Sequence, residues 1–219
     1  MRANQQDNRT LSQKVMLRQT ALRALRDETP VICETHGGRG DVWAAVYSHV
    51  EEGVVFEIDR DKSVLLAEQR PTWSVYEADV EMALAAGAGR HLAFNLVDVD
   101  PYGSSWETLE AFFSSDRPFA PRLLVVVNDG LRFKARGGSS WQAERLAPFV
   151  LRYGNHAVWR EYPTRICREL MDTTAALGGY AVRRFESYAT GLEGKMVHML
   201  AVLERHATGR PQLYGDPPP

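Results

Sequence analysis

Two carboxylates, an aromatic ring and a proline-fixed turn fall together in the segment NLVDVDPYGS, residues 95–104. Asp98 and Asp100 alternate at the end of an apolar run, where a buried charge is costly unless it is paired or used. Pro101 fixes the backbone of the turn that follows, so the neighbouring carbonyl groups point in a defined direction. Tyr102 adds a flat ring that can stack on a flat ligand. We interpret this segment as a functional turn.

The chemistry that best suits this turn is transfer to an amino group. An exocyclic amine on a base is a poor nucleophile, because its lone pair is delocalised into the ring. The Asp100 carboxylate and the Pro101 carbonyl can hold the amine hydrogens while Tyr102 stacks on the base, so catalysis is mostly positioning and electrostatics. Asp100 or water can take the released proton. A structural Pro-Gly turn with a capping aspartate is the alternative interpretation.

Three earlier strand ends carry a second group of candidate residues. The loop ETHGGRG, residues 34–40, supplies glycines where the backbone must turn sharply and pass close to a ligand. Asp59 follows the second apolar run and can accept the ribose hydroxyls of an adenosine-type ligand, with Glu57 as the second choice. Asp79 and Val80 follow the third run, where Asp79 can bind an adenine amino group or cap the next helix.

The sequence argues against several other sites. A nicotinamide fingerprint, G-x-G-x-x-G, and a phosphate-binding G-x-x-x-x-G-K-[ST] loop are both absent. No CxxC and no paired histidine spacing occurs, so we expect no metal site, and we interpret the six histidines as structural or surface residues. Cys33 and Cys167 lie in apolar contexts and are expected to be buried free thiols in a reducing cytoplasm.

The elements that must position these residues alternate along the chain. Apolar runs are expected to be strands at 31–34, 54–59, 74–79, 91–100 and 122–129, with helices at 42–51, 62–69, 80–86 and 105–114 between them. This alternation predicts a parallel sheet with helices on both faces, whose ligands bind at the carboxyl ends of the strands. A helix over 163–177 and an antiparallel hairpin of strands over 180–188 and 195–204 are expected to complete the fold.

Residues 131–162 interrupt this alternation and are expected to be irregular. They hold six basic and six aromatic residues against two acids, which suits phosphates and unstacked bases, or equally a capping subdomain with a small aromatic core. Together with the turn after the fourth strand and the end of the fifth strand, they supply the candidate substrate-binding residues Gly103, Asn128, Asp129, Arg132, Lys134 and Arg136.

The two ends of the chain are expected to lie outside the main domain, residues 29–206. Residues 1–28 predict a helical extension whose basic face, Lys14, Arg18, Arg23 and Arg26, is solvated or contacts nucleic acid. The Pro- and Gly-rich residues 207–219 are expected to be disordered. The net charge of -2 makes purely electrostatic nucleic-acid binding a poor expectation. No apolar run approaches the ~18–20 residues that span a bilayer, and no secretory signal is visible, so we expect a cytoplasmic protein.

Taken together, the chain resembles the class I S-adenosylmethionine (SAM)-dependent methyltransferases. The family's first motif, acid-x-Gly-x-Gly-x-Gly, matches at Glu34, Gly38 and Gly40, with His36 at the first glycine position. The resemblance implies SAM as cofactor and a seven-stranded Rossmann-like sheet. The cofactor-binding residues it implies are Glu34, His36, Gly38, Gly40, Asp59, Asp79, Val80 and Asp98.

The turn itself, DPYGS at residues 100–104, is similar to that of the tRNA guanine-N2 dimethyltransferases. This similarity implies that Asp100, Pro101 and Tyr102 are catalytic and that guanine N2 in tRNA is methylated. The large C-terminal region of that family is missing here. Methylation of an amine in DNA, of a small molecule or of a protein, and a non-catalytic module that binds a partner, remain alternatives, and a protein partner that recognises the target is compatible with the sequence.

Overall fold

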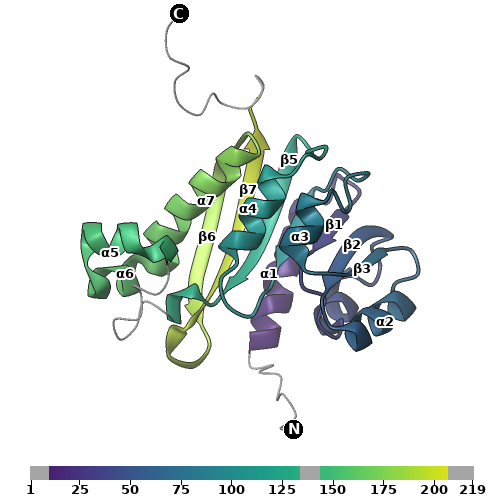
Figure 1. Cartoon of the computed structure of the whole chain (residues 1–219), viewed down its shortest axis with the longest axis horizontal. Helices are drawn as coiled ribbons and strands as arrows, with labels where there is room; N and C mark the ends of the chain where they lie inside the picture. The colour runs from purple at the N-terminus through teal and green to yellow at the C-terminus, as the bar shows by residue number, and fades with distance from the viewer. Residues whose placement is uncertain (1–9, 134–143, 207–219) are drawn as a thin grey trace, which may run out of the picture.

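The computed structural model describes residues 10–133 and 144–206, which form a seven-stranded sheet with helices on both faces (Figure 1). The sheet has the order β3-β2-β1-β4-β5-β7-β6. Its strands are β1 (Val31–Glu34), β2 (Glu52–Glu57), β3 (Ser74–Glu77), β4 (Leu96–Val99), β5 (Arg122–Asp129), β6 (Tyr180–Thr190) and β7 (Met196–Arg205). Strands β1 to β5 are parallel, and β7 lies antiparallel between β5 and β6. The expected fold class and the terminal hairpin are confirmed.

The strand order reverses between β1 and β4, which places a crevice at their carboxyl ends. The register pairs Glu34 of β1 with Asp98 of β4, so two of the candidate carboxylates end neighbouring strands. Strand β2 ends beside β1, so its Glu57 reaches the same edge of the sheet. The topology therefore gathers the candidate residues of three strands at one edge.

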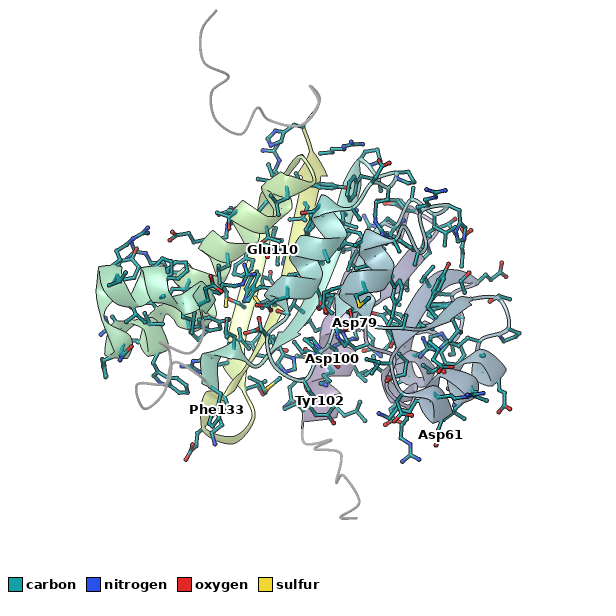
Figure 2. All side chains as sticks on the ribbon, viewed as in Figure 1. Asp61, Asp79, Asp100, Tyr102, Glu110 and Phe133 are labelled. Atoms are coloured by element: carbon teal, nitrogen blue, oxygen red, sulfur yellow. The ribbon has the colours of Figure 1, made fainter. Side chains whose placement is uncertain are left out.

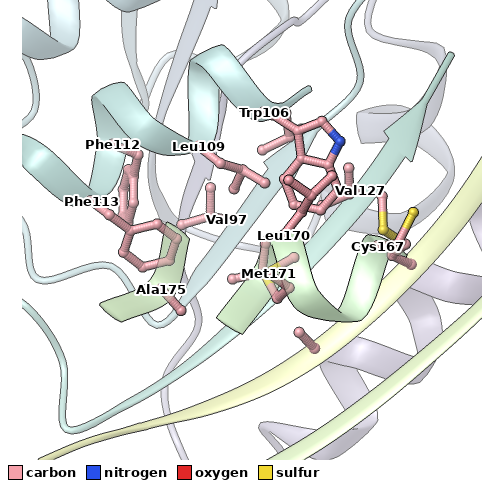
Figure 3. Packing of buried hydrophobic residues seen from close by; sticks show 14 of the residues in the cluster. Val97, Trp106, Leu109, Phe112, Phe113, Val127, Cys167, Leu170, Met171 and Ala175 are labelled. Atoms are coloured by element: carbon pink, nitrogen blue, oxygen red, sulfur yellow. The ribbon is translucent and has the colours of Figure 1, made fainter. Parts of the chain in front are cut away.

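One face of the sheet is covered by α3 (Val80–Ala85), α4 (Trp106–Ser114) and α7 (Cys167–Leu177) (Figure 1). Trp106 and Leu109 of α4 and Met171 of α7 are fully buried against Val97 and Val127 of the sheet (Figure 3). Helix α4 begins directly after the candidate turn. Packing of this aromatic-rich core therefore fixes the place where the turn must end.

The opposite face is covered by α1 (Leu11–Ala24), the π-helical segment η2 (Trp43–Tyr47) and α2 (Arg60–Gln69). Leu17 and Ala21 of α1, and Leu25 just after it, are buried in this second core with Val126 and Leu200 of the sheet. The segment expected as an extension thus contributes a packed helix to the domain. The basic face expected on this helix is not wholly exposed, because Arg18 is completely buried.

The segment 131–162, expected to be irregular, is largely helical in its described part. It contains η4 (Glu144–Leu146), α5 (Ala147–Tyr153) and α6 (Asn155–Glu161), and η5 (Tyr162–Ile166) then leads into α7. Gly154 separates α5 from α6 with a φ of 79°, a conformation that favours glycine. Phe149 and Tyr162 are buried in the first core, so these aromatics pack rather than face a ligand.

The hairpin between β6 and β7 turns through the short 3₁₀ segment η6 (Leu192–Gly194). Lys134, Arg136 and the tail 207–219 lie outside the described residues. Within the two described ranges, no helix combines the length and apolar character needed to cross a bilayer.

Candidate functional site

A cavity of about 940 Å³ opens at the carboxyl ends of β1, β2 and β4. It joins the glycine-rich loop to the turn after β4, and Figure 2 shows Asp100 and Tyr102 at this edge of the sheet. Its far wall is formed by the start of α1 and by the β6–β7 loop. The lining includes His36, Gly37, Gly38, Glu57, Asp59, Asp98, Asp100, Pro101, Tyr102, Gly103, Lys14, Arg18 and Lys195.

The glycine-rich loop is held against β2 by its backbone. Gly37 N donates to Phe56 O at 2.9 Å, and a Cβ on Gly37 would lie within 2.6 Å of side chains on both sides. Gly38 has a φ of 55°, and a Cβ there would meet nothing within 4 Å. Gly40 has a φ of 84°, a backbone conformation that favours glycine. The loop is thus tightly packed below and open at Gly38, where a ligand can approach the backbone.

Glu57 is tied directly to this loop, whereas Asp59 organises the next helix. The Glu57 carboxylate accepts Gly38 N at 2.8 Å through Oε2 and Asp59 N at 2.9 Å through Oε1. The Asp59 carboxylate caps α2 by accepting Lys62 N at 3.2 Å. Both residues border the cavity, but Glu57 also lines the neighbouring smaller hollow.

That smaller hollow, of about 100 Å³, lies between the ends of β2 and β3. Phe56, Ile58, Ala78 and Val80 give it apolar walls, which suit a flat heterocycle. Asp79 stands at its edge and also caps α3, accepting Met82 N at 3.0 Å. Asp79 therefore fills the capping role that the sequence left open, at a position bordering the hollow.

The Glu34 carboxylate is engaged inside the protein. It forms a short buried ion pair with Arg70, whose guanidinium lies 4.9 Å and 5.2 Å from the ring centroids of Trp43 and Trp73. Burial raises the pKa of Glu34, and Arg70 only partly opposes the rise. We interpret this pair as an anchor for the base of the glycine-rich loop.

The Asp98 carboxylate is also fully paired. Arg18 of α1 donates to both of its oxygens, at 2.5 Å and 2.6 Å, and Tyr47 donates its hydroxyl at 2.9 Å. Asp98 and Arg18 are both almost completely buried. The cost of placing this carboxylate at a strand end is therefore met by the N-terminal helix and the π-helical segment, and the geometry favours a structural role over cofactor binding.

Asp100 lies two residues beyond Asp98, and its side chain is more exposed than that of Asp98. Lys14 Nζ donates to its two oxygens at 2.8 Å and 2.7 Å, and Arg18 lies 3.6 Å away. Burial alone would raise the pKa of Asp100, but Arg18, Lys14 and the Asn128 side chain together hold it below its usual value. Asp100 is thus a persistent anion that presently holds an amine, the Lys14 ammonium.

The rest of the turn presents Tyr102 to the outside. Its side chain is 94% exposed beside the half-buried Pro101. Gly103 has a φ of 120°, and its carbonyl accepts Gly130 N at 2.7 Å. This bond joins the loop after β4 to the loop after β5, so the ring is available on a fixed backbone.

Asn128 and Asp129 have different surroundings. Asp129 accepts Ser105 N, Leu131 N and the Tyr162 hydroxyl at 2.6–3.0 Å, and burial raises its pKa to about 6. It therefore organises the loops at this edge. Asn128 is fully buried near Asp100, and its side chain helps to lower the pKa of that carboxyl.

The arginines expected to contact a target are largely engaged. Arg132 lies 4.1 Å from the Trp159 ring centroid and donates to the carbonyls of Trp159 and Gly194. Arg145 pairs with Glu110, which Figure 2 shows away from the turn. Arg152 and Arg160 also have acidic partners. The described part of the segment therefore gives little support to a basic surface for nucleic acid.

Sequence reasoning missed the N-terminal helix as part of the site. Lys14 and Arg18 are one helical turn apart, and Arg18 follows the buried Leu17. Two cations one turn apart, the second next to a buried leucine, were a signal that this helix pairs with buried carboxylates, because such carboxylates need cationic partners. His198, one of the histidines interpreted as structural or surface residues, lies inside the protein. It is fully buried, pairs in register with Asn128, and burial together with Arg18 lowers its pKa to about 4.

Among the described residues, no three metal-binding side chains lie close enough together to hold a metal ion. The site instead has four features. The backbone at Gly38 is open to a ligand, and the Glu57 carboxylate lies beside it. An apolar hollow lies next to them, and the turn after β4 carries the Asp100 anion and the exposed Tyr102 ring. These features lie together at the carboxyl edge of a Rossmann-like sheet.

Comparison with solved structures shows that the chain has the Rossmann-like methyltransferase fold. No family model matches the sequence, and no curated protein matches it. Among solved structures, M. jannaschii TYW2 in complex with AdoMet aligns with a TM-score of 0.57 and 11% identity, covering 94% of this chain and 80% of that one. N-methyltransferase NodS from Bradyrhizobium japonicum WM9, bound to S-adenosyl-L-homocysteine (SAH), aligns with a TM-score of 0.55 and 10% identity, covering 91% and 89%.

The methyltransferase domain of bacterial CtHen1-C aligns with a TM-score of 0.53 and 14% identity, covering 89% of this chain and 99% of that one. These similar structures are described as methyltransferases, or were solved with AdoMet or SAH bound. Their shared feature with this chain is the Rossmann-like methyltransferase fold.

Proposed function

We propose that this chain is a SAM-dependent N-methyltransferase acting on an exocyclic amine of a nucleic-acid base, with guanine N2 in tRNA as the first target to test. The observation that carries the proposal is one continuous cavity, lined both by Gly38 with Glu57 and by Asp100 with Tyr102. SAM, when bound, supplies an electrophilic methyl group. The two halves of the cavity separate its binding from the holding of the amine.

The cofactor half fits an adenosine-type ligand. The open position at Gly38 admits a ligand against the backbone, and the apolar hollow bordered by Asp79 and Val80 suits adenine. Glu57 is the better candidate for the ribose hydroxyls, because its carboxylate already lies on the loop, whereas Asp59 caps α2. Strand β2 thus offers two acids of which the first is better placed.

The acceptor half is arranged for an amine. The Asp100 carboxylate already accepts two hydrogen bonds from Lys14 Nζ, which supports a role for Asp100 in holding an amino group. A target amine that replaced Lys14 would be oriented by Asp100 and the Pro101 carbonyl. Tyr102 would then stack on the base, and Phe133, half-exposed beneath Lys195 Nζ at 4.8 Å, offers a second ring nearby.

A small amine is the second candidate acceptor. Thr10, Leu11, Gly191 and Met196 close the far side of the cavity, so α1 and the β6–β7 loop form a wall there. A cavity walled on this side favours a compact molecule. Transfer to free guanosine as well as to tRNA distinguishes the two candidates.

Calorimetry with SAM tests the cofactor half. We expect Glu57→Gln to weaken SAM binding about tenfold or more, because a charge-assisted hydrogen bond contributes ~1.5–3 kcal/mol. The matched variant Asp59→Asn should leave SAM affinity within about threefold and the fold about as stable as wild type, because asparagine caps a helix about as well as aspartate. The reverse ranking would assign the ribose to Asp59, and no heat with wild-type protein would contradict the cofactor assignment.

Turnover tests the acceptor half. Asp100→Asn should lower methyl transfer to in-vitro-transcribed tRNA by about 10²-fold or more while SAM affinity stays within about threefold. Asp116→Asn, an exposed aspartate between α4 and β5, is the matched control and should retain wild-type rates. Equal loss of SAM binding in Asp100→Asn would count against its assignment to the amine.

A further inference from the structure

His36 occupies a position at which the resembled motif has glycine, and it lies between the two halves of the site. Its side chain borders both the apolar hollow and the larger cavity that contains Asp100. A glycine there would leave only backbone at this point. The chain therefore places an imidazole where the cofactor half meets the acceptor half.

The hydrogen bonds of Thr35 decide which ring nitrogen carries the proton. Thr35 Oγ1 lies 3.1 Å from Asp98 O and can reach that carbonyl only as a donor. With its single hydrogen directed at that carbonyl, the hydroxyl accepts in the 2.8 Å contact with His36 Nδ1, and we assign the tautomer on this basis. In this assignment the neutral ring is protonated at Nδ1, and Nε2 keeps a free lone pair. Nε2 has no hydrogen-bond partner within the described part of the chain.

The charges around His36 suit a group that gains a proton only briefly. Burial lowers its pKa, and the carboxylates that face it counteract this only in part, so the ring is neutral at pH 7. A proton arriving on the ring would nevertheless be stabilised by those carboxylates. They are Asp98 of β4, Asp100 just after it, Glu57 of β2 and Glu81 of α3. Lys14 and Arg18 of α1 line the same cavity but are paired with Asp100 and Asp98.

Asp100 is poorly suited to keep a proton. Despite its burial, Arg18 and Lys14 hold the pKa of Asp100 below its usual range. It can orient an amine as an anion, but it is a weak base at neutral pH. Asp100 can therefore hold the amine, but it cannot retain the proton that the amine releases.

We propose that His36 Nε2 is the general base of this site, accepting the proton released when an amine held by Asp100 is methylated. This inference rests on the proposed function. The amine nitrogen forms a bond to the methyl carbon as the carbon–sulfur bond breaks, and the sulfur keeps the electron pair. The nitrogen then carries one proton in excess, which passes to Nε2 and afterwards to water.

Nuclear magnetic resonance tests the tautomer without any acceptor. In ¹⁵N-labelled protein with SAH at pH 7, we expect His36 to be neutral, with hydrogen on Nδ1 and a bare Nε2. His36→Asn identifies the signal by its loss. A neutral ring carrying its hydrogen on Nε2 would overturn the proposal, because that nitrogen could not accept a proton.

Chemical rescue tests the function. His36→Gly restores the motif glycine and leaves room for a free imidazole. With labelled SAM and in-vitro-transcribed tRNA, we expect His36→Gly and His36→Asn to lose about a hundredfold or more in kcat, with SAM affinity within about threefold. Added imidazole should restore much of the rate to His36→Gly alone, and the acid limb of the wild-type pH–rate profile should disappear in both variants.

The controls separate this inference from the proposed function. His49→Asn, at an exposed position, should behave as wild type. Wild-type turnover with equally active His36→Gly would overturn the role of His36 and leave the proposed function intact. A wild-type chain that binds SAM and methylates neither tRNA, DNA nor guanosine would contradict the proposed function, and the inference with it.

Discussion

At the scale of single residues, Asp98 and Asp100 lie at the same strand end but differ in their partners and exposure. Asp98 is saturated by Arg18 and Tyr47, whereas Asp100 retains 17% of its side-chain exposure and is held by the more mobile kind of partner, a lysine. Arg fits a buried bidentate pair, and Lys is a compact charge on a flexible stem. The identity of the paired cation therefore indicates a structural role for Asp98, whereas the lysine partner of Asp100 can be replaced by another amine.

Removing Arg18 tests the structural half of this division. We expect Arg18→Met to lower the free energy of unfolding by about 3–5 kcal/mol, because it leaves the Asp98 carboxylate buried without its partner. Urea denaturation measures the loss. Arg23→Met, an exposed arginine of the same helix, is the matched control, and a similar small effect of both variants would show that Asp98 does not depend on Arg18.

His198 makes stability depend on pH. Its pKa of about 4 in the folded chain lies below the ~6.5 of an unfolded histidine, so the unfolded state binds the proton more readily. The contribution is fully present above pH 6.5 and is lost as the pH falls toward 4, by at most about 3 kcal/mol. His198→Gln should flatten the fall in urea midpoint over that window, with His49→Gln controlling for the loss of one imidazole. An unchanged slope in His198→Gln would contradict this assignment.

At the scale of elements, α1 and the π-helical segments η2 and η5 support the site. Segment η2 supplies the Tyr47 hydroxyl to Asp98, and segment η5 supplies the Tyr162 hydroxyl to Asp129. Each π-helical segment thus satisfies a buried aspartate at the end of β4 or β5. Wider turns of this kind often occur at functional sites. Neither segment shows a distinct signature in sequence, because both read as ordinary helix starts.

Helix α1 also competes for the acceptor position. Lys14 must leave Asp100 before a target amine can bind, so Lys14→Gln should lower the acceptor KM by up to about fivefold, the range expected for a partly exposed ion pair. Steady-state kinetics on tRNA measure this, with Arg23→Gln on the same helix as the control. A raised KM would instead mean that Lys14 helps to bind the acceptor.

At the scale of the whole molecule, the sheet and its site edge were predictable, because alternating apolar runs fix strands and helices and parallel strands gather their carboxyl ends. The Gly38 opening and the Asp100 turn followed from the same logic. The role of α1 did not, since the pairing of Arg18 with Asp98 joins residues 80 positions apart and no local pattern specifies it. The helices α5 and α6 were missed because the aromatics of residues 131–162 suited ligand contacts and a small core equally, and the segment showed no clear helical period.

The most direct test of the account is methyl transfer from labelled SAM to unmodified tRNA, unmethylated DNA, guanosine and a buffer blank. The nucleosides are then identified by mass spectrometry. The account predicts label on an exocyclic amine, with N2-methylguanosine from tRNA as the first expectation, and its loss in Asp100→Asn. Label on a ring carbon or a ribose oxygen, or SAM bound with no label transferred to any acceptor, would contradict it.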